Sequence, residues 1–124
     1  MNKNGPVVII EDDQDDQELL KEVFKALQYK NAIVFFEDGE AALDFLNKTE
    51  VIPFLILSDI NMPGMSGLEL LRHIKQKYLI PPPVVMMITA YGDAENFNKA
   101  KELGADDFLT KPVDFNYLRE KFKQ

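Results

Sequence analysis

The chain has 124 residues, of which 46% are hydrophobic and 28% are charged, and its formal net charge at pH 7 is −7. This length and mix are typical of one globular domain with a single core. The acidity argues against a domain that binds nucleic-acid phosphates through a basic face, and the lack of cysteine excludes disulfides and thiolate metal sites. No segment resembles a signal peptide or is apolar over a bilayer-spanning length, so we expect a cytoplasmic protein that does not bind membranes.

Five short apolar runs recur along the chain and predict strands. They lie at residues 7–10, 33–36, 54–57, 84–88 and 108–109. The first, third and fourth runs are continuously apolar instead of alternating, which is typical of parallel strands covered on both faces.

Apolar residues at helical spacing follow each of these runs. The five predicted helical faces are Leu19, Leu20, Val23, Phe24 and Leu27; Ala41, Ala42, Phe45 and Leu46; Leu68, Leu71, Ile74 and Tyr78; Ala94, Phe97, Ala100 and Leu103; and Phe115, Leu118 and Phe122. Gly104 is a stop signal for the fourth helix, and the sequence IPPP at 80–83 prevents extension of the third.

This fivefold β-α alternation predicts an α/β fold with one domain over residues 1–124. We expect a doubly wound, five-stranded parallel sheet between two layers of helices, a (βα)5 sandwich. In such sheets, ligands bind beyond the carboxyl ends of the strands. The residues at these ends are therefore the candidates for function.

Several polar side chains stand at the predicted strand ends. The first strand is followed by Glu11, Asp12 and Asp13 and the second by Glu37 and Asp38, while the other three lead to Asp59, Thr89 and Lys111. Clustered carboxylates without histidine or cysteine favour a hard cation such as Mg²⁺, which also relieves their mutual repulsion. A lysine and a hydroxyl can hold phosphate oxygens, and a carboxylate such as Asp59 can attack phosphorus and form an aspartyl phosphate.

Four motifs built on these residues resemble the receiver domain of two-component response regulators over essentially the whole chain. They are IIEDD, SDINMPGMSG around Asp59, ITA ending in Thr89 and Ala90, and GADDFLTKP leading to Lys111. Each motif alone is modest, but all four occur in order and each stands at a strand end. The resemblance implies the flavodoxin-like fold of chemotaxis regulators, with strand order 2-1-3-4-5.

The resemblance also assigns roles within the site. It implies Asp59 as phosphoryl acceptor, with Mg²⁺ or Mn²⁺ held by Glu11, Asp12, Asp59 and the backbone carbonyl of Asn61. Thr89 and Lys111 would hold the phosphoryl group, and Ala90 belongs to the same switch segment. Phe108 would be the switch aromatic, although it lacks the hydroxyl of the tyrosine often found there. The Lys111–Pro112 bond matches the family's cis bond.

The same resemblance implies partners and an output. A sensor histidine kinase or a phosphotransfer protein would supply the phosphoryl group, and the fourth helix, fifth strand and fifth helix would then present a changed face to a downstream protein. The family also allows a dimer that forms on phosphorylation, and no direct contact of this domain with nucleic acid is expected. Apart from transfer to Asp59 and loss of that group, no enzyme activity is expected.

Other interpretations of the same residues stay open. Asp13, Asp15 and Asp16 suit a helix cap and first turn, and Asp12 taken alone suits a cap as well as it suits a ligand. Glu37 and Asp38 suit a turn and a cap better than they suit a ligand. A phosphatase on this scaffold would need a second acid at the position of Asn61, and a flavin protein would need a phosphate loop where residues 11–16 carry five acids. A receiver used only for binding would lack one of the site residues. The chain could also pass its phosphoryl group on to a histidine phosphotransfer protein in a phosphorelay.

Overall fold

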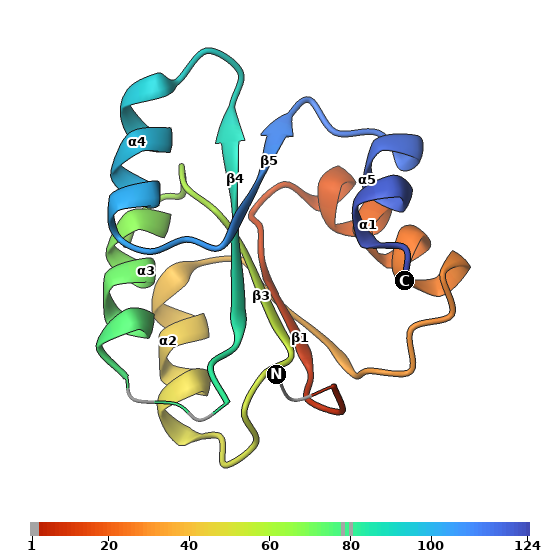
Figure 1. Ribbon diagram of the computed structural model, residues 1–124, viewed down its shortest axis with the longest axis horizontal. Coiled ribbons are helices and arrows are strands. Elements are labelled where there is room, and N and C mark those ends of the chain that lie inside the picture. Colours follow the sequence, from red (N-terminus) through yellow and green to blue (C-terminus); the bar gives the residue numbers. More distant parts are fainter. Residues whose placement is uncertain (1–2, 78, 80) are drawn as a thin grey trace.

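The computed structural model describes residues 3–77, 79 and 81–124, and Tyr78 and Ile80 of the sequence analysis lie outside them. The elements alternate between strand and helix along the chain (Figure 1). They are β1 (Val7–Ile10), α1 (Gln14–Ala26), β2 (Ile33–Phe36), α2 (Gly39–Lys48), β3 (Leu55–Asp59), α3 (Gly67–Gln76), β4 (Val84–Ala90), α4 (Ala94–Glu102), β5 (Asp107–Lys111) and α5 (Phe115–Phe122).

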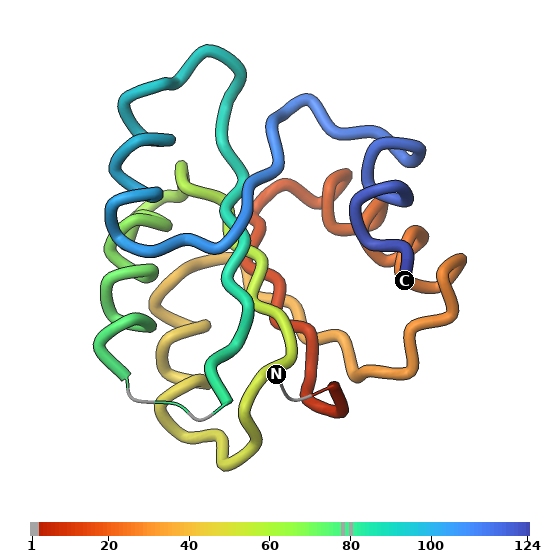
Figure 2. Tube along the Cα trace, in the orientation of Figure 1, coloured from red at the N-terminus to blue at the C-terminus, as the bar shows by residue number. Residues whose placement is uncertain are grey.

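The strands form one parallel sheet of order β2-β1-β3-β4-β5, which confirms the predicted fold class and strand order. Helices α1 and α5 lie on one face of the sheet, and α2, α3 and α4 lie on the other (Figure 1). The trace in Figure 2 places the carboxyl ends of β1, β3, β4 and β5 at the same end of the sheet. The residues that follow these strands therefore lie at one end of the sheet, as the sequence predicts.

Alternate residues of the strands build two apolar cores. Val7 and Ile9 pack with α1 and α5, and Val8 and Ile10 pack with the helices of the opposite face. Every residue of β1 is buried because both of its faces are covered, and this explains its unbroken apolar sequence. Within the described residues, no helix is long and apolar enough to span a bilayer.

Side chains of Asp or Ser cap the amino ends of all five helices. The caps are Asp13, Asp38, Ser66, Asp93 and Asp114, and each accepts hydrogen bonds from backbone N–H groups of the first turn. The cap roles predicted for Asp13 and Asp38 are confirmed, as is the stop at Gly104, which has φ +99° just past α4.

Three strands run further than their apolar sequences predict. Asp59 ends β3, Thr89 is the last residue but one of β4, and Lys111 ends β5. Each of these residues still pairs in the sheet, with registers Asp59–Ile88, Thr89–Thr110 and Ala90–Lys111. A prediction from hydrophobicity alone ends these strands too early, because a polar residue follows each apolar run: Ser58 in β3, Thr89 in β4 and Thr110 in β5.

Candidate functional site

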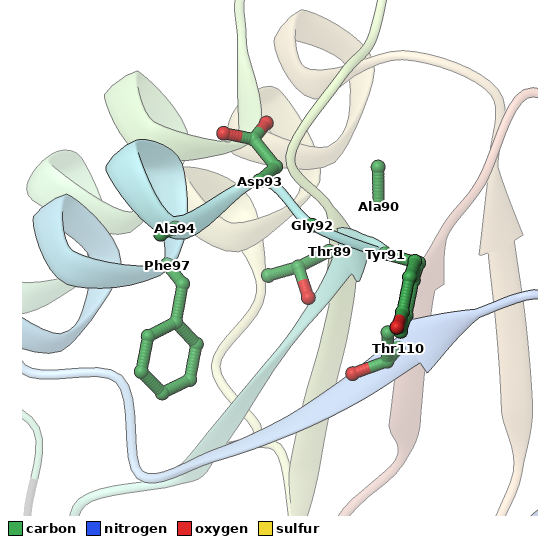
Figure 3. A pocket seen from close by; sticks show the side chains of 8 residues that line it. All are labelled: Thr89, Ala90, Tyr91, Gly92, Asp93, Ala94, Phe97 and Thr110. Atoms are coloured by element: carbon green, nitrogen blue, oxygen red, sulfur yellow. The ribbon is translucent and has the colours of Figure 1, made fainter.

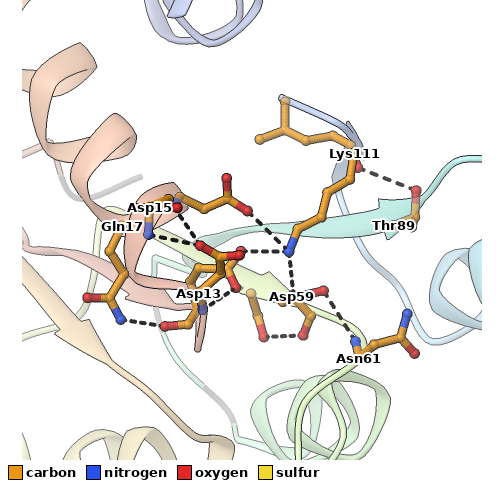
Figure 4. Close-up of polar contacts among 11 residues, drawn as sticks. Asp13, Asp15, Gln17, Asp59, Asn61, Thr89 and Lys111 are labelled. Carbon is orange, nitrogen blue, oxygen red and sulfur yellow. Dashed lines mark hydrogen bonds and ion pairs between the residues drawn. The ribbon is translucent and has the colours of Figure 1, made fainter. Parts of the chain in front are cut away.

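Lys111 lies at the centre of the candidate site and contacts carboxylates from three elements. Its Nζ is 2.9 Å from Asp59 Oδ2 on β3 and 3.0 Å from Glu11 Oε1 just past β1. A third oxygen, Asp16 Oδ2 on α1, lies 3.3 Å away. Figure 4 draws these ion pairs as dashed lines that meet at the lysine. The parallel sheet brings these groups together because its carboxyl ends share one edge.

Glu11 is completely buried, and both its backbone N–H and its backbone carbonyl are hydrogen-bonded. Its N–H donates to Phe36 O (3.0 Å), and its carbonyl accepts a 2.5 Å hydrogen bond from Gln17 Nε2. The N–H of Asp13 donates to Glu11 Oε2 over 3.1 Å. Loss of solvent raises the pKa of Glu11 from 4.5 to about 7, and the charge of Asp59 adds to this, although the Asp13 N–H and Lys111 oppose it.

Lys111 is partly buried, and its contacts with carboxylates stabilise the charged form of its side chain. Burial alone would lower the pKa of Lys111, but its contacts with Asp59 and Glu11 more than offset this and raise that pKa above its usual value. The ammonium is therefore a fixed positive charge at neutral pH, placed against the carboxylate of Asp59.

Three acids of the site fit a hard metal cation. One oxygen each of Glu11, Asp12 and Asp59 lies within 4.8 Å of the others, with Glu11 and Asp59 buried and Asp12 exposed. Glu11 Oε1 has no hydrogen-bond partner in the described part of the chain, because the nearby ammonium forms an ion pair without hydrogen-bond geometry. A buried oxygen without such a partner, in a set made only of carboxylates, suits Mg²⁺ or Mn²⁺.

The loop after β3 holds Asp59 closely. The N–H of Asn61 donates to Asp59 Oδ1 (3.2 Å), and the N–H of Gly67 donates to Ile60 O (2.8 Å). A Cβ on Gly67 would stand only 2.1 Å from Asp59 O, so the first residue of α3 must be glycine for this backbone approach. On the other side of the site, the Lys111–Pro112 peptide bond is cis.

The residues predicted to form a switch lie on β4 and β5. Two of them, Thr89 and Ala90, line a cavity of about 300 Å³ (Figure 3). Thr89 is buried, and its hydroxyl makes only a long contact of 3.4 Å with Leu109 O. Ala90 is exposed, and Tyr91 is 86% exposed. Phe108 is half-buried, and its ring centroid lies 4.3 Å from that of Phe97.

The sequence does not predict the tertiary contacts of Phe97 and Asp16, although Asp16 is a first-turn acid of α1 as expected. Helical spacing predicts Phe97 as core, but it is only partly buried: its ring packs on Phe108 of β5 and lines the cavity. Asp16 suits a first-turn acid of α1, and its contact with Lys111 has no local sequence signal. Contacts between residues so far apart in the chain depend on how α1 and β5 are placed in the fold.

Comparisons with known proteins agree with this geometry. The family model "Response regulator receiver domain" matches residues 7–123. The Bacillus subtilis protein sporulation initiation phosphotransferase F is 34% identical over 122 residues, which cover 98% of this chain and 93% of that protein. A Thermotoga maritima cyclic di-GMP phosphodiesterase is 38% identical over 115 residues, which are 93% of this chain but only 29% of that protein.

Solved structures show the same fold. The Mn²⁺-bound form of response regulator Rcp1 superposes with a TM-score of 0.81 at 29% sequence identity, over 94% of this chain and 88% of that one. The strand order, the architecture and the sequence matches agree with one another. The chain belongs to the response regulator receiver domain family of two-component signalling.

Proposed function

We propose that residues 1–124 form a phosphoacceptor switch that takes a phosphoryl group onto Asp59 from a sensor histidine kinase or a phosphotransfer protein. The observation that carries the proposal is the 2.9 Å contact between Lys111 Nζ and Asp59 Oδ2, beside a buried Glu11 oxygen that has no hydrogen bond among the described residues. This arrangement combines a carboxylate nucleophile with a cation already in place to receive an anionic group.

In the transfer step, a carboxylate oxygen of Asp59 bonds to phosphorus as the bond between phosphorus and the donor histidine nitrogen breaks. The electron pair of the broken bond stays on the histidine ring. Lys111 then turns its ammonium from Asp59 toward a phosphoryl oxygen, and the hydroxyl of Thr89 donates to another. Both groups lie at strand ends next to Asp59, because β4 lies between β3 and β5.

Glu11, Asp12, Asp59 and the carbonyl of Asn61 are the groups that would hold Mg²⁺ or Mn²⁺. The cation, when bound, offsets the negative charge that gathers on the phosphoryl oxygens. The residues themselves prepare the site, since Glu11 is buried and held by the Asp13 N–H, and Asp59 is held by the Asn61 N–H. Support comes from the all-carboxylate donor set and from the similarity to Rcp1, whose solved form is described as Mn²⁺-bound.

Phosphorylation would change the face made by α4, β5 and α5 through rearrangements of Thr89, Ala90 and Phe108. The hydroxyl of Thr89 makes one long contact, and Phe108 packs against the partly buried Phe97, which lines the same cavity as Thr89. A rearrangement of these side chains would therefore break few contacts. The new charge would shift the population between two packings of this face. A downstream protein, or a second phosphorylated copy, would bind the altered face.

A second role is an intermediate in a phosphorelay, which passes its phosphoryl group on to a histidine phosphotransfer protein. The similarity to a Bacillus subtilis protein named as a phosphotransferase, over 93% of its length, favours this role. Both roles place the chain in the cytoplasm with protein partners. Neither calls for nucleic-acid binding by this domain, in agreement with its net charge of −7, or for an enzyme activity beyond handling its own phosphoryl group.

Intact mass after incubation with acetyl phosphate and Mg²⁺ tests the proposal. We expect a gain of one phosphoryl group that is absent without the metal and absent in Asp59→Asn. Asp44→Asn is the matched control, because this acid is exposed on α2 and its ion pair is with Lys48 of the same helix. A folded wild-type protein that gains no mass from acetyl phosphate and binds no beryllofluoride would overturn the proposal.

A further inference from the structure

Asp16 is an acid of the site that the proposed function does not use. It lies in the first turn of α1, its side chain is 23% exposed, and Asp16 Oδ2 is 3.3 Å from Lys111 Nζ. Glu11 and Asp59, the other two partners of the lysine, share in the acid cluster that fits a metal, whereas Asp16 lies outside that cluster. Of the three carboxylates that contact Lys111, Asp16 is therefore the one that would not be drawn away by a bound metal.

The neighbouring Asp15 separates this contact from the general role of a first-turn acid. The backbone N–H groups of Asp15 and Asp16 both donate to Asp13 Oδ1, over 2.8 and 3.2 Å. Both carboxylates also stand near the amino end of α1, where negative charge is favourable. Only the side chain of Asp16 reaches Lys111, while that of Asp15 is exposed.

We propose that Asp16 is a positioning residue that competes with the phosphoryl group on Asp59 for the ammonium of Lys111. This inference rests on the proposed function. An ammonium has three N–H donors, and in the unphosphorylated protein three carboxylates surround it. When the phosphoryl group arrives, its oxygens need the same donors, and Asp16 holds the lysine back toward α1.

The consequence is a weaker hold on the phosphoryl group and a shorter life of the phosphorylated state. Removing the charge of Asp16 frees the lysine to turn fully to the phosphoryl oxygens. We expect Asp16→Asn to bind beryllofluoride about three- to tenfold more tightly at saturating Mg²⁺, which is the scale of one partly buried ion pair. The half-life of the phosphorylated protein would lengthen in the same variant.

The experiment is a calorimetric titration of beryllofluoride into the Mg²⁺-saturated protein, for wild type, Asp16→Asn, Asp16→Glu and Asp15→Asn. Asp15→Asn is the matched control, since it removes the same charge from the same helix turn, and we expect a change below about twofold. Asp16→Glu keeps the charge and should stay near wild type. Thermal melting of each variant checks that α1 is intact.

A double-mutant cycle tests whether Asp16 acts through the lysine. The gain from Asp16→Asn should disappear when it is measured in a Lys111→Met background, with phosphorylation lifetime as the readout. A gain that persists without Lys111, or equal effects of Asp16→Asn and Asp15→Asn, would overturn the inference and leave the proposed function intact. A wild-type protein that takes up neither beryllofluoride nor a phosphoryl group would instead overturn both.

Discussion

The two halves of the candidate site are built very differently. The acid half, formed by Glu11, Asp12 and Asp59 at the ends of β1 and β3, has two buried carboxylates that accept backbone hydrogen bonds. The switch half, formed by Thr89, Phe108 and Phe97 on β4, β5 and α4, has one hydroxyl contact of 3.4 Å and two partly buried rings, of which that of Phe97 lines a cavity. Lys111 joins the acid half from the end of β5.

In the proposed function, this difference allows one end of the sheet to serve both phosphoryl transfer and signalling. In the acid half, backbone N–H groups and Lys111 hold the carboxylates close together. Their mutual repulsion lowers the stability of the folded protein, and a bound cation would relieve it. In the switch half, a change in packing breaks few polar contacts among the described residues, so its free-energy cost is small. Variants in the two halves should therefore differ in the size and kind of their effects.

Matched glycine substitutions should give the largest contrast in stability. In Gly67→Ala the new Cβ would lie 2.1 Å from Asp59 O and 2.6 Å from Ile60 Cα, so the backbone of the acid half must move. We expect a loss of more than about 3 kcal/mol in the free energy of unfolding. Gly92→Ala, beyond β4, has no neighbour within 4 Å but has φ +82°, and should cost about 1 kcal/mol. Urea titrations of both variants measure the contrast, and equal losses would contradict it.

The pH dependence of stability should identify the cost of ionised Glu11. Its pKa is about 7 in the folded protein and 4.5 ordinarily, so the folded state binds more protons between these values. The metal-free protein should lose stability as the pH rises from about 4 to 8, by up to about 3 kcal/mol. Glu11→Gln should remove this loss, and saturating Mg²⁺ should reduce it. Denaturant titrations at several pH values measure the difference, and identical slopes for wild type and Glu11→Gln would refute the assignment.

Removing the lysine should expose the repulsion within the acid half. Lys111→Met leaves Glu11, Asp16 and Asp59 without their common cation, and we expect a loss of about 2 kcal/mol in unfolding free energy at pH 7 without metal. Saturating Mg²⁺ should restore part of the loss. Lys48→Met is the control, because the ion pair of this exposed lysine is with the exposed Asp44, and the substitution should cost a few tenths of a kcal/mol. A loss no larger than that of the control would show that the lysine does not stabilise the acids.

The smallest effect should come from the aromatic pair of the switch half. A double-mutant cycle with Phe97→Ala and Phe108→Ala should give a coupling of about 0.5–1 kcal/mol in unfolding free energy, the usual size for two packed rings. Phosphorylation with acetyl phosphate should change this coupling if the ring of Phe108 moves. A coupling that is the same in both states would mean that the pair does not take part in the switch.

Much of the architecture could be predicted from the sequence. Continuous apolar runs such as residues 7–10 indicate strands covered on both faces, and the helical faces between them follow from a 3.6-residue period. Asp13, Asp38 and Gly104 could be assigned to helix ends because caps depend on local backbone geometry. The full lengths of β3, β4 and β5 could not, because pairing with neighbouring strands extends them through polar residues.

By itself, the sequence determined which residues stand at the strand ends and what chemistry they can supply. Only the tertiary structure decided which of these groups meet. Asp12 stays exposed, whereas its neighbour Glu11 becomes a buried acid with a raised pKa. Asp16, in a helix turn, reaches Lys111, and the partly buried ring of Phe97 packs on Phe108. Caps and periodicity depend on neighbours in the chain, whereas burial, charge pairing and ring packing depend on the distances that the folded chain sets between remote residues.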